Sequence, residues 1–187
     1  MTVAPRLVDL TVYAGDCRAR GRIALDGDRI TDLLNTHDEV ELVDVMLESF
    51  EDGHAVEALD LVVARDEVFA VSVGEPRGNP QRRTRTQRYP VSLQVGAYAV
   101  QGYLHALPGA DPILGFRHRR AIVPLTNAWI SYEAADGHHR TFVPTLLINR
   151  ALTEWIALVA DEEIELPEGA TDYQPGGLRK GLLGQPL

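Results

Sequence analysis

An internal repeat over residues 10–160 constrains the fold of this chain more than any other feature of the sequence. Two segments run through the same order of apolar stretches, glycine-containing turns and a Leu-x-Asp/Asn strand, with similar spacing. Self-similarity at a fixed spacing is the sequence signature of a duplicated structural unit. The equivalent positions, one from each copy, are Gly21 and Gly102, Gly27 and Gly109, Leu42 and Leu125, Asp44 and Asn127, Gly53 and Gly137, and Arg65 and Arg150.

Short apolar runs that end at turn residues fill each copy and indicate strands joined by tight connections. Apolar and polar residues alternate over Leu10–Tyr13 and over Val91–Val95, as expected for half-buried strands. Asp-Gly pairs at 52–53 and 136–137 are typical of hairpin turns. We therefore expect about five strands per copy, with a sharp turn near Arg65 and its counterpart in the second copy.

One stretch of each copy has helical character. In residues 28–35 three aliphatic side chains fall on one helix face, so we expect one or two turns packed over a barrel mouth. The counterpart at 111–116 contains Pro112, which suits only the first turn of a helix, so this stretch is either a short helix start or a plain loop. Asp28 and Asp32 are four residues apart and could bind a hard cation, but we favour Asp28 as the helix cap.

These patterns predict a mainly β fold, a tandem duplication of a small Sm-like or SH3-like barrel unit with one short helical turn in each copy. Packing of the copies against each other would add the apolar burial that such small units need. The linker has three prolines, two glycines and almost no aliphatic residues. The predicted boundaries are 1–74 for the first barrel, 75–90 for the Arg/Pro-rich linker, 91–160 for the second barrel and 161–187 for an acidic, then Gly/Pro-rich tail.

The first copy resembles the Sm-like proteins. Its residues G21-x-I-x-L-x-x-x-D28-R-I-x-D-L-L-N35, with Arg65 much later, are similar to the Gly, Asp and Asn of the first Sm-like motif and the Arg of the second. Asp66 follows Arg65 where that motif has Gly, and Phe116 lies near the Asn35 position in the second copy, so the RNA-contacting pattern is broken. The resemblance implies the barrel fold.

A second resemblance is to a bacterial family of small Sm-like or SH3-like barrel repeats that has no established activity. The first copy carries R29-I-T-D-L-L-N35, and the second carries G102-Y-L-H-A-L-P-G109, P124-L-T-N127 and N149-R150. The resemblance implies structural roles for the repeat motif and a bacterial source. The residues to which we assign such a role are Gly21, Asp28, Asn35, Arg65, Gly102, Asn127 and Arg150.

Arginines gather before the second copy and form a candidate anion-binding group: Arg82, Arg83, Arg85 and Arg88. An arginine cluster before a barrel strand is similar to that of a PilZ-type cyclic-dinucleotide receptor, because guanidinium groups pair with phosphates. The spacing of these arginines and the missing Asp/Asn-x-Ser-x-x-Gly motif depart from the PilZ pattern. The net charge of −9 opposes a broad nucleic-acid surface.

Neither a catalytic nor a metal-binding pattern emerges from the remaining polar residues. His37 and the pair His138-His139 are interpreted as solvated turn residues, because neighbours in an extended chain point to opposite faces. Cys17, the single cysteine, has no histidine context that would mark a catalytic thiol. We find no phosphate loop and no nucleophile elbow, and so expect no enzyme, no cofactor and no metal.

The leading hypothesis is a cytoplasmic, non-enzymatic module that binds another protein or assembles with itself. The alternative is a nucleic-acid or nucleotide binder that uses the Arg-rich linker. No apolar run approaches the roughly 18 residues of a membrane span, so no membrane partner is expected. Trp129, Tyr132 and Trp155 are interpreted as core residues that would mark a binding face if exposed, and a tail segment could dock on a partner.

Overall fold

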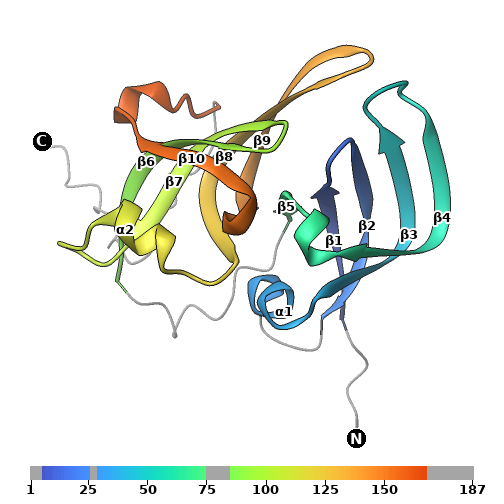
Figure 1. Cartoon of the computed structure of the whole chain (residues 1–187), viewed down its shortest axis with the longest axis horizontal. Coiled ribbons are helices and arrows are strands. Elements are labelled where there is room, and N and C mark those ends of the chain that lie inside the picture. The colour runs from blue at the N-terminus through green and yellow to red at the C-terminus, as the bar shows by residue number, and fades with distance from the viewer. Residues whose placement is uncertain (1–5, 26–28, 75–84, 168–187) are drawn as a thin grey trace, which may run out of the picture.

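One continuous antiparallel sheet of ten strands forms the described part of the protein, which is residues 6–25, 29–74 and 85–167 of the computed structural model (Figure 1). The prediction of a mainly β fold is confirmed. The strands are β1 (Arg6–Tyr13), β2 (Cys17–Leu25), β3 (Glu39–Ser49), β4 (Ala55–Ala64), β5 (Ala70–Val73), β6 (Gln87–Val95), β7 (Tyr98–Ala106), β8 (Ile122–Ala134), β9 (Gly137–Asn149) and β10 (Thr153–Leu158). The helices are α1 (Ile30–Thr36) and α2 (Pro112–Arg117), with short 3-10 turns η1 (Arg65–Glu67), η3 (Arg150–Leu152) and η4 (Asp161–Glu163).

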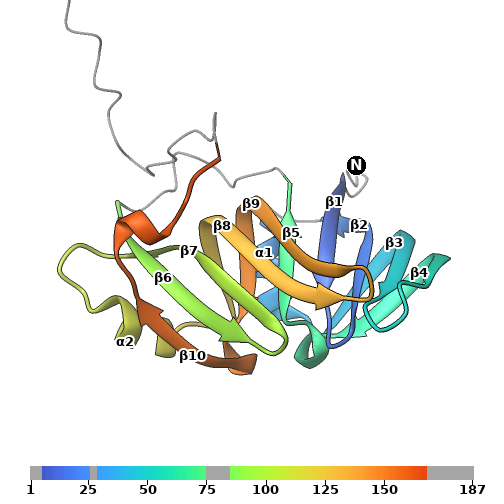
Figure 2. The same cartoon turned by 90° about the horizontal axis from the view of Figure 1, so that it is seen from above.

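Two halves with the same order of elements make up this sheet. The N-half (residues 6–73) runs β1, β2, α1, β3, β4, η1, β5, and the C-half (residues 87–158) runs β6, β7, α2, β8, β9, η3, β10. Across the sheet the order is β10-β6-β7-β8-β9-β5-β1-β2-β3-β4, so in each half the last strand lies beside the first. Figure 2 shows the strands following one another from β10 through β5 to β4.

Local sequence signals explain where the elements turn. Gly53 and Gly137 have φ values of +69° and +119° in the two Asp-Gly turns, a region that side chains disfavour. Pro112 occupies the first turn of α2, and the Asp111 carboxylate accepts from the main-chain N–H groups of Ile113 and Leu114. The N-cap of α1 is Arg29, and the predicted cap Asp28 lies outside the described residues.

A β-bulge recurs at the same place in both halves. The pairing of β2 with β3 shifts register at Gly21, and the pairing of β7 with β8 shifts register at Gly102. Opposite these glycines, Asp44 and Asn127 have φ values of +51° and +46°, and they are the only non-glycine residues with positive φ in the described ranges. The bulge therefore needs a glycine on one strand and a residue that tolerates the left-handed region on the next.

The two hydrophobic cores exchange side chains across the junction between the halves. Ile122 and Leu147 of the C-half belong to the core of the N-half. Tyr13, Phe50 and Ala70 of the N-half belong to the core of the C-half. Since each core is completed by the other half, the two halves stabilise each other.

The strand β6 begins earlier than the predicted end of the linker. Gln87 is its first residue, and Pro90 pairs with Tyr103 of β7. Arg88 therefore lies in a strand and not in the linker, because the pairing with β7 extends the alternation beyond the aliphatic residues that mark Val91–Val95. Arg82 and Arg83 lie outside the described residues.

Replacement of Gly102 by Ala is expected to destabilise the protein. A Cβ at this position would lie 2.9 Å from the Ala128 Cβ and 3.1 Å from its Cα, so the strands must shift. We expect a loss of about 1–3 kcal/mol in the free energy of unfolding, measured by urea denaturation. Gly115→Ala in α2 is the matched control, since a Cβ there meets no atom within 4 Å, and it should be neutral or slightly stabilising. Equal stability of the two variants would contradict the bulge argument.

Candidate functional site

Two strands of the sheet have an unpaired edge in the described part of the chain. β4 pairs only with β3, and β10 pairs only with β6. They are the first and last strands in the order of the sheet. An exposed strand edge presents a row of N–H and C=O groups that can pair with another chain. The two edges are therefore the first candidate interaction surface.

The junction between the halves shows what an equivalent edge looks like when it is covered. There β5, the last strand of the N-half, pairs with β9, the fourth strand of the C-half. The free edges belong to the equivalent strands of the opposite halves: β10 is the last strand of the C-half, and β4 is the fourth strand of the N-half. The molecule therefore contains one joined pair and one separated pair of the same two strand types.

Side chains that are buried at the junction have exposed counterparts at the free edges. Leu147 of β9 is 2% exposed, and its counterpart Val62 of β4 is 57% exposed. Ala70 of β5 is 0% exposed, and its counterpart Trp155 of β10 is 50% exposed. Leu147 and Ala70 are each buried in the core of the other half. Val62 and Trp155 thus occupy positions that would be buried if another unit paired with the free edge, as Leu147 and Ala70 are at the junction.

Two asparagines fix the junction by hydrogen bonds to the main chain. The Asn149 side-chain amide donates to the carbonyls of Arg65 (3.1 Å) and Val68 (2.9 Å). Asn35, at the end of α1, donates to the Ile122 carbonyl (3.1 Å) and accepts from the Ile122 N–H (3.0 Å). These side chains add hydrogen bonds between the halves, because each satisfies main-chain polar groups of the opposite half.

An aromatic cluster fills the same junction. Tyr98 meets Tyr13 edge to face with ring centroids 5.6 Å apart, and Phe50 stacks on Tyr132 at 4.6 Å. The Tyr98 hydroxyl donates to the main-chain carbonyl of Ala14. Burial raises the pKa of Tyr13 to about 12 and that of Tyr98 further. Both hydroxyls therefore stay protonated, and the cluster is structural.

The two arginines of the repeat motif make matching contacts. The main-chain N–H of Arg65 donates to the Asp38 carbonyl (2.8 Å), and the main-chain N–H of Arg150 donates to the Ala121 carbonyl (2.7 Å). Each guanidinium also donates to the carbonyl one residue before that acceptor. Both arginines therefore donate hydrogen bonds to the loop that precedes the third strand of their half.

Two of the four predicted anion-binding arginines, Arg85 and Arg88, lie in the described part of the chain. Arg85 is exposed. Arg88 lies over the Tyr103 ring at 4.7 Å from its centroid and has its guanidinium 4.0 Å from the Asp161 carboxylate. Arg88 therefore contacts an aromatic ring and a carboxylate of its own chain.

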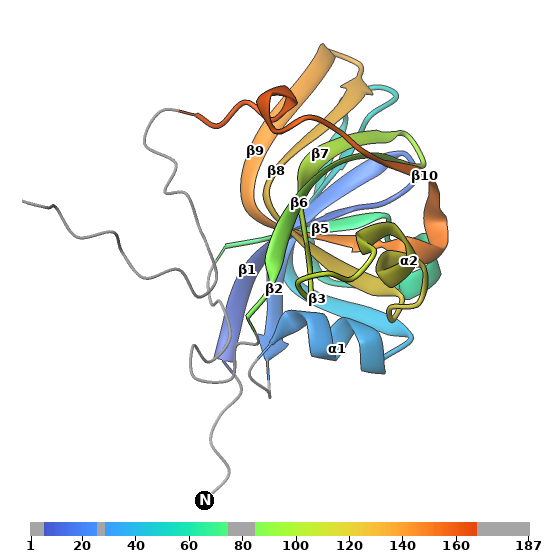
Figure 3. The same ribbon diagram turned by 90° about the vertical axis from the view of Figure 1, so that its left-hand side faces the viewer.

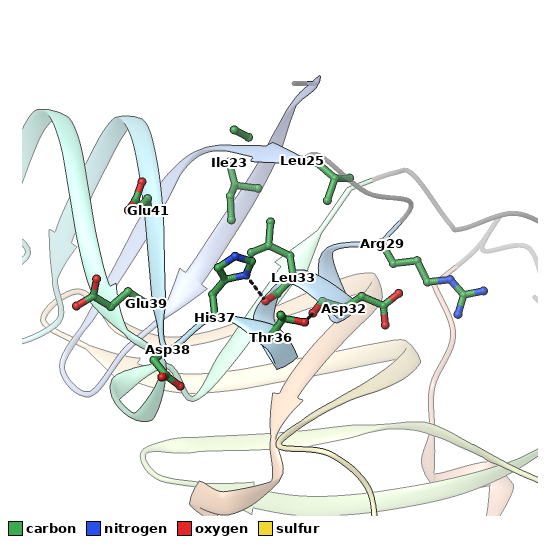
Figure 4. Close-up of a pocket in the computed structure, with 11 residues that line it drawn as sticks. Ile23, Leu25, Arg29, Asp32, Leu33, Thr36, His37, Asp38, Glu39 and Glu41 are labelled. Atoms are coloured by element: carbon green, nitrogen blue, oxygen red, sulfur yellow. Dashed lines mark hydrogen bonds between the residues drawn. The ribbon is translucent and has the colours of Figure 1, made fainter. Parts of the chain in front are cut away.

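A cleft of about 760 Å³ lies beside α1 (Figure 4). Ile23, Leu25 and Leu33 supply apolar lining, and Asp32 and Glu41 are among its acidic residues. Its hydrogen bonds run from the end of α1 back to main-chain carbonyls of that helix. An acidic and apolar lining suits a small cationic group. The hydrogen bonds of the cleft do not join a nucleophile to a base, as a catalytic site of that kind requires. They stabilise the end of α1 instead.

The prediction that His138 and His139 are turn residues is wrong, because both lie in β9 and pair with residues of β8. The His138 ring contacts the Glu133 carboxylate at 2.8 Å, and the His139 ring contacts the Asp136 carboxylate at 2.6 Å and stacks on Tyr132. Within residues 6–25, 29–74 and 85–167, no group of three or more His, Cys, Asp or Glu side chains could hold a metal ion. The same residues contain no helix with the length and apolar character needed to cross a membrane.

Comparison with protein-family models, with curated proteins and with solved structures found no match to this chain.

His105 makes the stability of the fold dependent on pH. Its ring contacts the Thr126 hydroxyl at 2.7 Å, and its carbonyl accepts from Arg119. Burial, together with the charges of Arg119 and Arg88, lowers the pKa of His105 from 6.5 to about 4. Between these values the unfolded chain binds a proton that the folded chain does not. This contribution to stability is therefore complete above pH 6.5 and is lost as the pH falls towards 4.

The free energy of unfolding of wild type should fall more steeply than that of His105→Gln between about pH 7 and pH 4.5, because only wild type has the depressed histidine pKa. Urea denaturation at several pH values measures the slope. His54→Gln replaces an exposed histidine and should keep the wild-type slope. Parallel curves for wild type and His105→Gln would contradict the assignment.

Proposed function

We propose that this chain is a tandem pair of Sm-like or SH3-like barrel units that works as a non-enzymatic self-assembly module. Copies would join head to tail, with β4 of one copy pairing with β10 of the next. The observation that carries this proposal is the β5–β9 junction, because it joins the same two strand types within one chain. Head-to-tail contacts between unlike surfaces generate a ring if the rotation closes and a filament if it does not.

The internal junction supplies a register for the proposed contact. β5 pairs with β9 through Ala70 opposite Ile148, Val71 opposite Leu147, and Ser72 opposite Leu146. Each of these six residues has a counterpart in the other half, which is separated by the same number of residues from the 3-10 turn of that half. Transferred to the free edges, the register sets Trp155 opposite Val63, Ile156 opposite Val62, and Ala157 opposite Leu61.

Apolar burial is the expected driving force. Val62 would enter the core of the neighbouring C-half, as Leu147 enters that of the N-half. Trp155 would pack against the neighbouring N-half, as Ala70 packs in the C-half. Large apolar side chains at an unpaired strand edge favour association, since most native edges carry charges or prolines that prevent it.

Charge opposes the same contact. Glu57 and Asp60 lie on β4, Glu154 lies on β10, and the whole chain carries a net charge of −9. Like charges at the facing edges repel one another, and salt screens this repulsion over about 10 Å at 0.1 M ionic strength. Self-assembly should therefore strengthen as salt rises, whereas phosphate-mediated nucleic-acid binding weakens with salt.

Val62→Lys and Trp155→Ser should each abolish the assembly by removing the apolar side chain of one edge. Light scattering coupled to size exclusion measures the mass over a range of protein and salt concentrations. Val56→Lys is the matched control, because Val56 is also an exposed apolar residue of β4 but lies outside the transferred register.

We expect wild type and Val56→Lys to form a defined oligomer or a filament that grows with salt, and the two edge variants to remain monomeric. A wild-type monomer under all conditions would overturn the proposal. Assembly that survives both edge variants would show that another surface is used, and nuclease-sensitive assembly would favour nucleic-acid binding instead.

A further inference from the structure

A segment of the chain covers the outer face of the C-half, and no described segment covers the equivalent face of the N-half. This segment, residues 159–167, is here called the strap. It starts with a hydrogen bond from the Val159 N–H to the Pro90 carbonyl of β6 (3.1 Å) and continues to Glu165, whose carbonyl accepts from the Trp129 ring N–H. Figure 3 shows it crossing from β10 towards β8 and β9.

The face beneath the strap is basic and aromatic. Arg88 of β6 lies over the Tyr103 ring at 4.7 Å, and Arg140 of β9 lies over the Trp129 ring at 4.5 Å, each measured to the ring centroid. Trp129 also contacts Phe142 edge to face at 5.4 Å. We call these five residues the Arg/Trp face. Guanidinium groups stacked on aromatic rings keep their N–H groups available for carboxylates.

The strap is complementary in charge to this face. It begins Val-Ala-Asp-Glu-Glu-Ile-Glu. Its Asp161 carboxylate lies 4.0 Å from the Arg88 guanidinium, and its Glu165 carboxylate lies 3.5 Å from the Arg140 guanidinium. Ile164 is buried between these two acidic positions. The strap thus binds as an acidic peptide does, through two carboxylates, one aliphatic side chain and one main-chain carbonyl.

Few contacts hold the strap. Its two ion pairs join carboxylates and guanidinium groups 4.0 Å and 3.5 Å apart, and all four side chains are partly exposed to solvent. Exposed ion pairs contribute little to stability. The strap is therefore weakly held.

The equivalent face of the N-half has no covering segment among the described residues. There Asp44, the counterpart of Asn127, pairs with Arg22 at the surface. Around them lies a shallow hollow of about 500 Å³ that includes Gly21 and Met46, the counterparts of Gly102 and Trp129. Within the described residues, the strap is therefore a feature that distinguishes the C-half from the N-half.

We propose that the Arg/Trp face is a docking site for an acidic segment of a partner protein, and that the strap occupies the site in cis until that segment displaces it. The Trp129 N–H binds a main-chain carbonyl, Arg88 and Arg140 bind carboxylates, and an aliphatic side chain fills the space taken by Ile164. A main-chain carbonyl on the tryptophan marks a polypeptide ligand. The tether keeps the strap at a high local concentration, so an incoming segment must compete with it.

The test uses a labelled peptide with the sequence of residues 159–167 and measures its binding by fluorescence anisotropy. The release variant combines Asp161→Asn, Ile164→Ala and Glu165→Gln in the full chain. The matched control, Glu162→Gln with Glu163→Gln, removes the same number of charges from exposed residues outside the two ion pairs. We expect the release variant to bind the peptide at least tenfold more tightly than wild type or the control, and Arg140→Gln to remove the gain.

A protease recognition sequence inserted after Ala160 gives a second measurement, which does not depend on whether the release variant folds. Cleavage of the folded chain should raise peptide affinity by a similar factor. No gain after either treatment overturns the proposal, as does equal binding of a peptide whose acidic residues are replaced by Gln and Asn. Tighter binding of an oligothymidylate than of the peptide would assign the face to nucleic acid and would also overturn it.

Discussion

The pairing of β5 with β9 is the contact on which the rest of the structure depends. It makes one sheet of two five-stranded halves, and it brings Leu147 into one core and Ala70 into the other. Asn35 and Asn149 then satisfy main-chain groups across the same line. The junction is therefore an interface of cross-strand pairing, shared apolar burial and satisfied polar groups, built within one chain.

The same pairing explains why the described sheet has an unpaired strand edge at each end. A unit that uses its last strand on one side and its fourth strand on the other leaves one of each free, however many units are joined, until the array closes. As a result, the apolar side chains of Val62 and Trp155 on these two strands are exposed. The Arg/Trp face lies on strands β6 to β9, whereas the free edges belong to β4 and β10, and β6 is the strand that pairs with β10.

Much of the local structure could be predicted because local signals carry it. Asp-Gly pairs marked two hairpin turns, and Pro112 marked the start of a helix. The repeat matched Gly21 with Gly102, but the bulge at each of them was not predicted. The left-handed backbone of Asp44 and Asn127 had no such signal, since both residues are common in ordinary turns and loops.

What the sequence did not reveal depends on contacts between distant residues. The apolar pattern of β4 is that of a buried strand, and only the pairing order shows that its outer edge is free. The strap has the composition of a solvated acidic tail, and its contacts depend on a face to which four strands, β6 to β9, contribute. Asn149 was noted only as part of a motif, and its bonds to the other half follow from the β5–β9 pairing.

The most direct test of the account is a disulfide between copies in the register of the internal junction. In a Cys17→Ser background, Val62→Cys and Ile156→Cys are introduced together, and the oxidised protein is analysed without reductant. Directly opposed residues of paired strands have Cβ atoms about 4.5–5.5 Å apart, close enough for a disulfide to form with slight adjustment. The account predicts a covalent ladder or closed ring from the double variant and no ladder when Val56→Cys replaces Val62→Cys. Only monomers after oxidation, or equal cross-linking from both variants, would contradict it.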